Sequence, residues 1–142
     1  MKLSTKGRHA VTAMMELALQ QDKGPVTLAD ISAQQSISIS YLEQLFARLR
    51  KHKLVTGMRG PGGGYCLARP ASEITIASIL ATVDDVSRRE EMPQSAGAQM
   101  WVHLSNRIYD YLNSITLDKA IEAAASEDQK ELFGTDVHQS AA

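Results

Sequence analysis

A single cation stands at the edge of a glycine-rich run in the first half of this chain. Arg59 is followed by Gly60, Pro61, three further glycines and Tyr65. Glycine has no Cβ, so a thin loop of this composition lets the backbone approach another molecule closely. A guanidinium at such a tip can bind an anion, and the negative potential of a narrow DNA minor groove attracts it. We therefore expect Arg59, Gly60 and Pro61 to lie against a nucleic acid.

The segment before this run carries hydrogen-bonding side chains on a predicted helix. Its apolar residues recur at i, i+3, i+4 and i+7, the spacing of one buried stripe; they are Leu42, Leu45, Phe46 and Leu49. On the opposite face, Ser40, Glu43 and Gln44 could reach base edges, since glutamate accepts from cytosine and glutamine pairs with adenine. Glu43 also fits another role, because Ser40 to Glu43 has the spacing of a capping box, in which the carboxylate satisfies the helix's own amides.

Basic side chains on the same helix suit the phosphates of DNA, which fix the position of a bound protein without specifying sequence. Arg48, Arg50 and Lys51 are the candidates, and a solvated helix face is the alternative for them. The residues predicted to bind DNA are Ser38, Ser40, Tyr41, Glu43, Gln44, Arg48, Arg50, Lys51, Arg59, Gly60 and Pro61.

Several short elements must hold these side chains in place. Ser4 or Thr5 can cap a first helix that ends before Gly24; its apolar stripe is Val11, Met14, Met15 and Ala18. Thr27 starts a short second helix, and the polar interruption at 35–38 joins it tightly to the next, as in a helix-turn-helix. Two short strands, 54–58 and 65–68, flank the glycines. We predict a mostly α fold with a small β wing, a winged helix-turn-helix DNA-binding domain over residues 1–83.

Two other classes of function fit less well. A nucleotide-binding loop needs Lys-Ser/Thr after its last glycine, or a glycine where Tyr65 stands, and the chain has neither. No nucleophile, base and orienting group can be assembled from the sequence, so we do not expect an enzyme. A winged helix used for protein interaction is an alternative, in which Arg50 and Arg59 would be dispensable.

The charge of the chain is divided between its halves. The net charge is −1, but residues 1–70 carry +6 and residues 71–142 carry −7. The basic half suits a polyanion, although ordinary surface solvation explains such a split equally well. No apolar run approaches the roughly 20 residues that span a bilayer, and the N-terminus has no apolar signal core. We therefore expect a cytoplasmic protein without a membrane partner.

The second half is predicted to form an arm that pairs with another copy. Residues 84–99 are polar and contain Pro93, which predicts a flexible linker. Residues 100–125 should form a long dimerisation helix and a C-terminal helix from Leu117 to Ala125, and 126–142 a disordered tail. The apolar seam of the long helix is Trp101, Leu104, Ile108, Tyr111, Leu112 and Ile115. Such a seam could pack on its own domain, but DNA-binding proteins of this size use twofold symmetry to span two half-sites, which favours a homodimer.

Several runs of the sequence match a known pattern, the most specific being Arg59 to Tyr65. The others are Leu3-Ser4-Thr5-Lys6-Gly7-Arg8, Ala29-Asp30-Ile31-Ser32, Ser40-Tyr41-Leu42-Glu43-Gln44-Leu45-Phe46, Arg48-Leu49-Arg50, Leu54-Val55 and Leu112-Asn113-Ser114-Ile115-Thr116-Leu117. Together they closely resemble the IscR-type regulators, the bacterial iron-sulfur cluster regulators and their relatives. The resemblance implies a homodimeric winged-helix transcription factor that binds an operator in double-stranded DNA. It implies Ser40, Glu43 and Gln44 at the major groove and Arg59 in the minor groove.

One departure from this resemblance concerns the cluster. The relatives that sense cluster status carry three cysteines and a histidine before the long helix, whereas residues 84–100 contain neither residue type. The last two ligand positions fall near Ser95 and Ala98, and neither side chain is a soft ligand for iron. Cys66, the only cysteine, lies in the predicted wing and cannot replace three thiolates. We predict no metal and no cofactor; an iron-sulfur or redox-sensing regulator with other ligands is the alternative.

Overall fold

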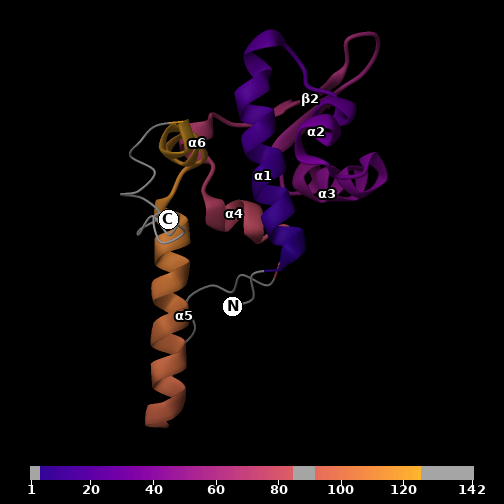
Figure 1. The fold of residues 1–142 in the computed structure, drawn as a ribbon. Coiled ribbons are helices and arrows are strands. Elements are labelled where there is room, and N and C mark those ends of the chain that lie inside the picture. The colour runs from indigo at the N-terminus through magenta and orange to yellow at the C-terminus, as the bar shows by residue number, and fades with distance from the viewer. Residues whose placement is uncertain (1–3, 85–91, 126–142) are drawn as a thin grey trace, which may run out of the picture.

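The chain folds into six α-helices and one two-stranded antiparallel sheet within the described residues, which are 4–84 and 92–125 of this computed structural model (Figure 1). The helices are α1 (Thr5–Gln20), α2 (Leu28–Gln35), α3 (Ile39–Lys51), α4 (Ile76–Leu80), α5 (Ala96–Ser114) and α6 (Leu117–Ala125). The strands are β1 (Val55–Met58) and β2 (Gly64–Leu67), and 3-10 turns occupy Gln21–Lys23 and Ala71–Glu73. The predicted class is therefore confirmed. The predicted tail and residues 85–91 of the predicted linker lie outside the described residues.

Side-chain caps set where the first helices begin. The hydroxyl of Ser4 accepts the amide of Gly7 at 3.0 Å, which starts α1. Thr27 and Asp30 form a reciprocal capping box at the start of α2. These caps satisfy amides that have no partner inside the helix. Both starts agree with the sequence-based prediction.

The first helix runs through the middle of the fold, and its buried face differs from the predicted one. The fully buried side chains are Ala10, Ala13, Met14 and Leu17. Of the predicted stripe only Met14 is fully buried, while Val11, Met15 and Ala18 are half-buried at the edge of the core. Since α1 contacts α2, α4, α6 and β2, its small alanines allow close packing where these elements converge. Apolar spacing alone does not distinguish this buried face from the predicted stripe, because both recur at i, i+3, i+4 and i+7.

The C-terminal helix packs into the same core as the N-terminal half. Around an antiparallel bridge between Thr75 and Thr116, the amide of Ile76 donates to Ile115 O at 2.9 Å. The amide of Leu117 returns a bond to Ile74 O at 2.8 Å, and Leu117 is fully buried. The predicted division at residue 83 therefore does not describe the core. We call α1–α4, the sheet and α6 the head.

The long helix α5 extends away from the head (Figure 1). It begins at Ala96, because the Ser95 hydroxyl caps it by accepting the amide of Ala98 at 3.3 Å. Residues 96–99, predicted as flexible linker, are thus helical. Asp84 is also held in place, since its carboxylate accepts the amide of Ser4 at 3.1 Å and the Ser4 hydroxyl at 2.5 Å. Among the described residues, no helix is long and apolar enough to cross a membrane.

Candidate nucleic-acid interface

A tight turn sets the angle between α2 and α3. Ser36 ends α2 in the left-handed conformation, with φ of 54°, and its amide bonds to Ser32 O at 2.9 Å. The Ser32 hydroxyl donates to Ile37 O at 2.5 Å. The hydroxyl of Ser38 then accepts the amide of Tyr41 at 3.3 Å and starts α3. Two helices joined in this way form the predicted helix-turn-helix.

The recognition helix α3 has one buried and one exposed face. The predicted stripe is fully inside the core, as Leu42, Leu45, Phe46 and Leu49. The predicted contacts Ser40, Glu43, Gln44, Arg48 and Lys51 are exposed. Because Ser38 is the cap, Glu43 lies in the second helical turn and the alternative capping box of Ser40 and Glu43 is wrong. The Glu43 carboxylate therefore faces outward without a capping role.

Tyr41 differs from its neighbours because it packs against the head. Its ring lies edge-on to the ring of His9, with centroids 5.4 Å apart, and its hydroxyl is 3.4 Å from His9 Nδ1. The side chain is half-buried against the core. We therefore assign Tyr41 to fixing α3 on α1. The sequence carried no signal for this contact, since His9 and Tyr41 are 32 residues apart.

The wing is a β-hairpin closed by a tight turn. The two strands pair antiparallel with Met58 opposite Gly64. Beyond them, Gly63 N donates to Gly60 O at 2.8 Å, with Pro61 and Gly62 between, and Gly62 has φ of 74°. This is a type II turn, with proline at its second position and glycine at its third. Arg59, Gly60 and Pro61 are exposed at this tip.

Contacts with the head and with α3 fix the direction of the wing. Val26 pairs with Tyr65 through two backbone bonds of 2.9 and 2.7 Å. A Cβ on Gly64 would overlap the carbonyl oxygen of Val26, so only glycine permits this approach. The Tyr65 ring packs on Phe46 of α3, with centroids 4.8 Å apart.

Arg50 of the recognition helix lies beside the wing. A Cβ built on Gly57 of β1 would lie 3.8 Å from Nη1 of Arg50. The guanidinium therefore lies beside the first strand, although the residue is exposed. Figure 1 shows α3 and the wing on the same side of α1. The exposed polar face of α3 and the Arg59 tip thus belong to elements on the same side of the head.

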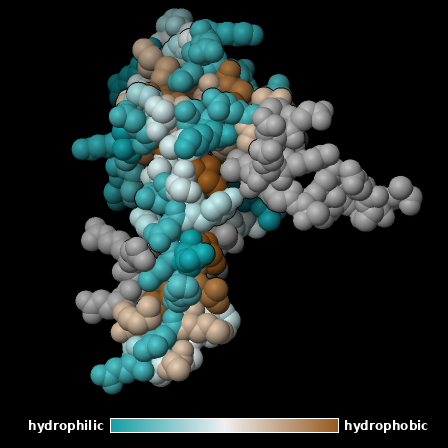
Figure 2. Space-filling model, turned by 90° about the vertical axis from the view of Figure 1, so that its left-hand side faces the viewer, coloured by the Kyte–Doolittle hydropathy of each residue, from teal (hydrophilic) through white to brown (hydrophobic). Residues whose placement is uncertain are grey.

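A second exposed surface runs along α5 and is apolar. Trp101 is 66% exposed, Leu104 43% and Ile108 45%, and Tyr111 is also exposed. Figure 2 shows hydrophobic side chains gathered along one side of the protruding helix, below a largely hydrophilic head. Two residues of the predicted seam differ: Leu112 is half-buried and Ile115 is buried in the core of the head. The exposed seam therefore ends at Tyr111, because the chain turns into α6 after Ser114.

The positions near which the resemblance would place cluster ligands carry out helix capping instead. Ser95 caps α5, and Ala98 supplies the amide that it binds. Cys66 lies in β2, half-exposed, with its sulfur 3.9 Å from the sulfur of Met58. Among the described residues no three His, Cys, Asp or Glu side chains are grouped closely enough to hold a metal ion. The donor set does not fit a cluster with thiolate ligands.

Comparisons with known proteins agree with this geometry. The family model Rrf2, described as an iron-dependent transcriptional regulator, matches residues 3–123. The HTH-type transcriptional regulator IscR of Pectobacterium carotovorum is 44% identical over 150 residues, covering 99% of this chain and 92% of its own length. IscR of Escherichia coli O1:K1 is 46% identical over 130 residues, covering 85% and 80% respectively.

Two solved structures share the arrangement of elements. IscR of T. potens superposes with a TM-score of 0.77 at 38% identity, covering 91% of each chain. CymR, the global cysteine regulator of B. subtilis, superposes with a TM-score of 0.77 at 34% identity, covering 86% of this chain and 97% of that one. The relatives are transcriptional regulators rather than enzymes. The chain therefore belongs to the Rrf2 family, and it is a DNA-binding transcriptional regulator of the IscR-like, winged helix-turn-helix type.

Proposed function

We propose that the protein is a homodimeric, sequence-specific regulator that acts on double-stranded operator DNA in the cytoplasm. The observation that carries this proposal is that α3, with its exposed polar face, and the hairpin that ends at the exposed Arg59 lie on the same side of α1. In this assignment Ser40, Glu43 and Gln44 face base edges in the major groove. Arg59, at the end of a fixed turn, enters the adjacent minor groove.

The remaining exposed cations of α3 contact phosphates. Arg48 and Lys51 lie in the last turns of the helix, where their contacts orient the protein on the duplex without specifying sequence. Arg50, beside β1, adds charge where the wing and helix meet.

Pairing through α5 would supply the second half-site. The exposed Leu104 and Ile108 are one helical turn apart on a face that the head does not cover. A twofold pair of such helices gives the left-handed packing of a short coiled coil. It would present two recognition helices to one duplex, as paired helix-turn-helix proteins do at half-sites one helical turn apart.

Binding across a salt series tests the DNA assignment. A duplex selected from random DNA should bind with an affinity that falls about a thousandfold between 50 and 200 mM salt, as expected for six or more phosphate contacts. A scrambled duplex should bind far more weakly. Failure to select any duplex at low salt would favour a protein-interaction module instead.

Ile108→Glu tests the pairing. A charge in the exposed seam should give the mass of a single chain by light scattering and lower the affinity for a two-half-site operator. Leu19→Glu is the matched control, because Leu19 is an apolar residue 55% exposed on α1. A dimeric Ile108→Glu protein would contradict pairing through this face.

We further propose that regulation does not use a resident iron-sulfur cluster. The support is the donor set: one cysteine in the chain, placed in the wing, and a serine and an alanine at the linker positions. Purification without oxygen tests this directly. We expect no visible absorption and no iron or sulfide above background, whereas a brown protein with stoichiometric iron would overturn the proposal.

A further inference from the structure

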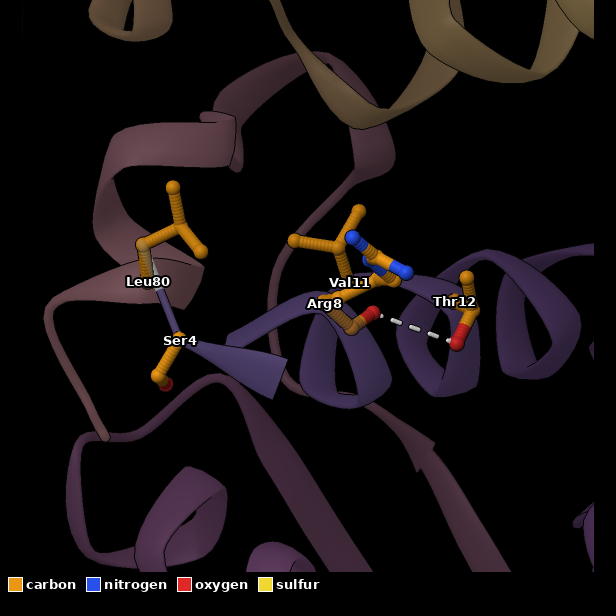
Figure 3. Close-up of a pocket in the computed structure, with 5 residues that line it drawn as sticks. All are labelled: Ser4, Arg8, Val11, Thr12 and Leu80. Atoms are coloured by element: carbon orange, nitrogen blue, oxygen red, sulfur yellow. Dashed lines mark hydrogen bonds between the residues drawn. The ribbon is translucent and has the colours of Figure 1, made fainter. Parts of the chain in front are cut away.

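An apolar hollow opens on the head between α1 and α4. Its volume is about 290 Å³, and it is lined by Ser4, Arg8, Val11, Thr12 and Leu80. Figure 3 shows Leu80 of α4 and Ser4 on one side, and Val11, Arg8 and Thr12 of α1 on the other. Arg8 is exposed, so it lies at the rim of the hollow. Val11 is half-buried although it packs on the core. The hollow therefore leaves apolar surface at the head that the described part of the chain does not cover.

The free end of α5 carries a side chain of the kind that would fill it. Trp101 is the only tryptophan in the sequence and the most exposed of the large apolar residues described. A tryptophan is among the side chains with the most apolar surface to bury. An arginine beside a bound indole adds a cation–π attraction, which Arg8 could supply at the rim.

An antiparallel pair of α5 helices would bring this tryptophan to the head. If two copies pair so that Leu104 faces Ile108 of the other helix, Trp101 lies level with Tyr111 of the other copy. Within one chain these two residues are ten apart, about 15 Å along the axis. Pairing thus moves the tryptophan from the far end of one arm to the base of the other. At that base α5 contacts α4, and α4 contacts α1.

We propose that the hollow receives Trp101 of the partner subunit. This inference rests on the proposed dimer and deepens it. The partner's α5 would contact α1 and α4 of the head as well as the α5 with which it pairs. The indole lies against Val11 and Leu80, with the Arg8 guanidinium over its face. Each head is then fixed to both arms.

Fluorescence of the single tryptophan tests the proposal on the full chain. In the dimer, emission should lie at shorter wavelength and be protected from acrylamide quenching, relative to the monomeric Ile108→Glu protein. Val11→Glu should abolish most of that protection while the mass remains that of a dimer. Leu19→Glu, on the same helix but outside the hollow, should leave the protection unchanged.

A cross-link gives a second measurement that does not depend on how Val11→Glu folds. Two proteins, Arg8→Cys and Trp101→Cys, each also carrying Cys66→Ser, are mixed and oxidised. Peptide mass analysis should find the disulfide that joins residue 8 of one copy to residue 101 of the other. The opposite result is a dimer that forms no such disulfide and whose tryptophan protection is unchanged by Val11→Glu. That result would contradict the placement of Trp101 in the hollow but not the pairing of the α5 helices. A chain that is monomeric at every concentration would overturn both.

Discussion

The exposed side chains of α3 and the wing have different tasks because their surroundings differ. Glu43 and Gln44 project from a helix whose opposite face is fully buried, so their backbone is fixed. Tyr41 was predicted to contact DNA together with them, but its ring packs on His9. The exposure and the charge of the side chains on the outer face of α3 could be predicted from residue type and helical spacing. The tyrosine contact could not, because it depends on how α1 crosses α3.

Arg59→Ala tests the wing tip. Arg59 is exposed beside the type II turn, and its loss should weaken operator binding by about 1–3 kcal/mol. Fluorescence anisotropy at one fixed salt concentration measures the change. Arg69→Ala is the control, since it removes an exposed arginine beyond the end of β2. Equal effects of the two substitutions would show that only net charge matters.

Glu43→Ala separates base contact from helix stability. Ser38, rather than Glu43, caps α3, so the free energy of unfolding should change by no more than about 0.5 kcal/mol. The base preference opposite the first turns of α3 should relax, because a carboxylate accepts from cytosine and rejects bases that offer it only acceptors. Selection from random DNA measures the preference. If both proteins return the same motif, Glu43 does not contact bases.

At the scale of elements, ends and turns could be predicted better than packing faces. The starts of α1 and α2 follow from side-chain caps, and the predicted bounds of α6 agree with the structure. The alternative capping box of Ser40 and Glu43 is wrong, and residue type could not exclude it because Ser38 and Ser40 are equally good caps. The buried face of α1 was misplaced by one residue, because positions 10, 13, 14 and 17 have the same apolar spacing as the predicted positions 11, 14, 15 and 18. Both errors arise where several elements meet.

The end of α3 offers a stability test. Lys53 has φ of 61°, and its amide bonds to Arg50 O at 3.0 Å while that of Leu54 bonds to Leu49 O at 3.0 Å. This is a Schellman motif, whose left-handed position usually holds glycine. Lys53→Gly should therefore raise the free energy of unfolding by about 0.5–1 kcal/mol.

Lys53→Ala controls for the charge. It removes the same ammonium group but keeps a Cβ, so it should bring no gain in denaturant unfolding. A gain from alanine equal to that from glycine would mean that backbone conformation is not the cause.

At the scale of the whole molecule, the basic and acidic halves of the sequence do not form separate units. They are joined by contacts between distant residues. The Thr75–Thr116 bridge places α6 in the head, and Asp84 binds the cap of α1. Neither contact could be predicted, because each joins residues tens of positions apart and depends on the packed core. The flexible linker was predicted from polarity, but at its described ends Asp84 bonds to Ser4 and residues 96–99 are helical.

Gly7→Ala tests the contact of Asp84. Alanine normally favours a helix over glycine by about 1 kcal/mol. Here its Cβ would overlap Oδ2 of Asp84 and lie 2.8 Å from Leu80 Cδ2. We expect Gly7→Ala to lower the free energy of unfolding by about 2 kcal/mol. The cost should be smaller in an Asp84→Ala background, and urea unfolding of all four proteins measures this coupling. Additive effects would contradict the contact.

Packing of α6 into the head also has a consequence during synthesis. Domains usually begin to fold from the N-terminus as the chain leaves the ribosome. Here the surface of α1 that contacts α6 stays open until α6, with its buried Leu117 and Ala120, has emerged. The recognition helix is made early, but its scaffold is complete only after α6 has been made. A truncated translation product would therefore lack a finished DNA-binding head and could not compete with the intact regulator for its operators.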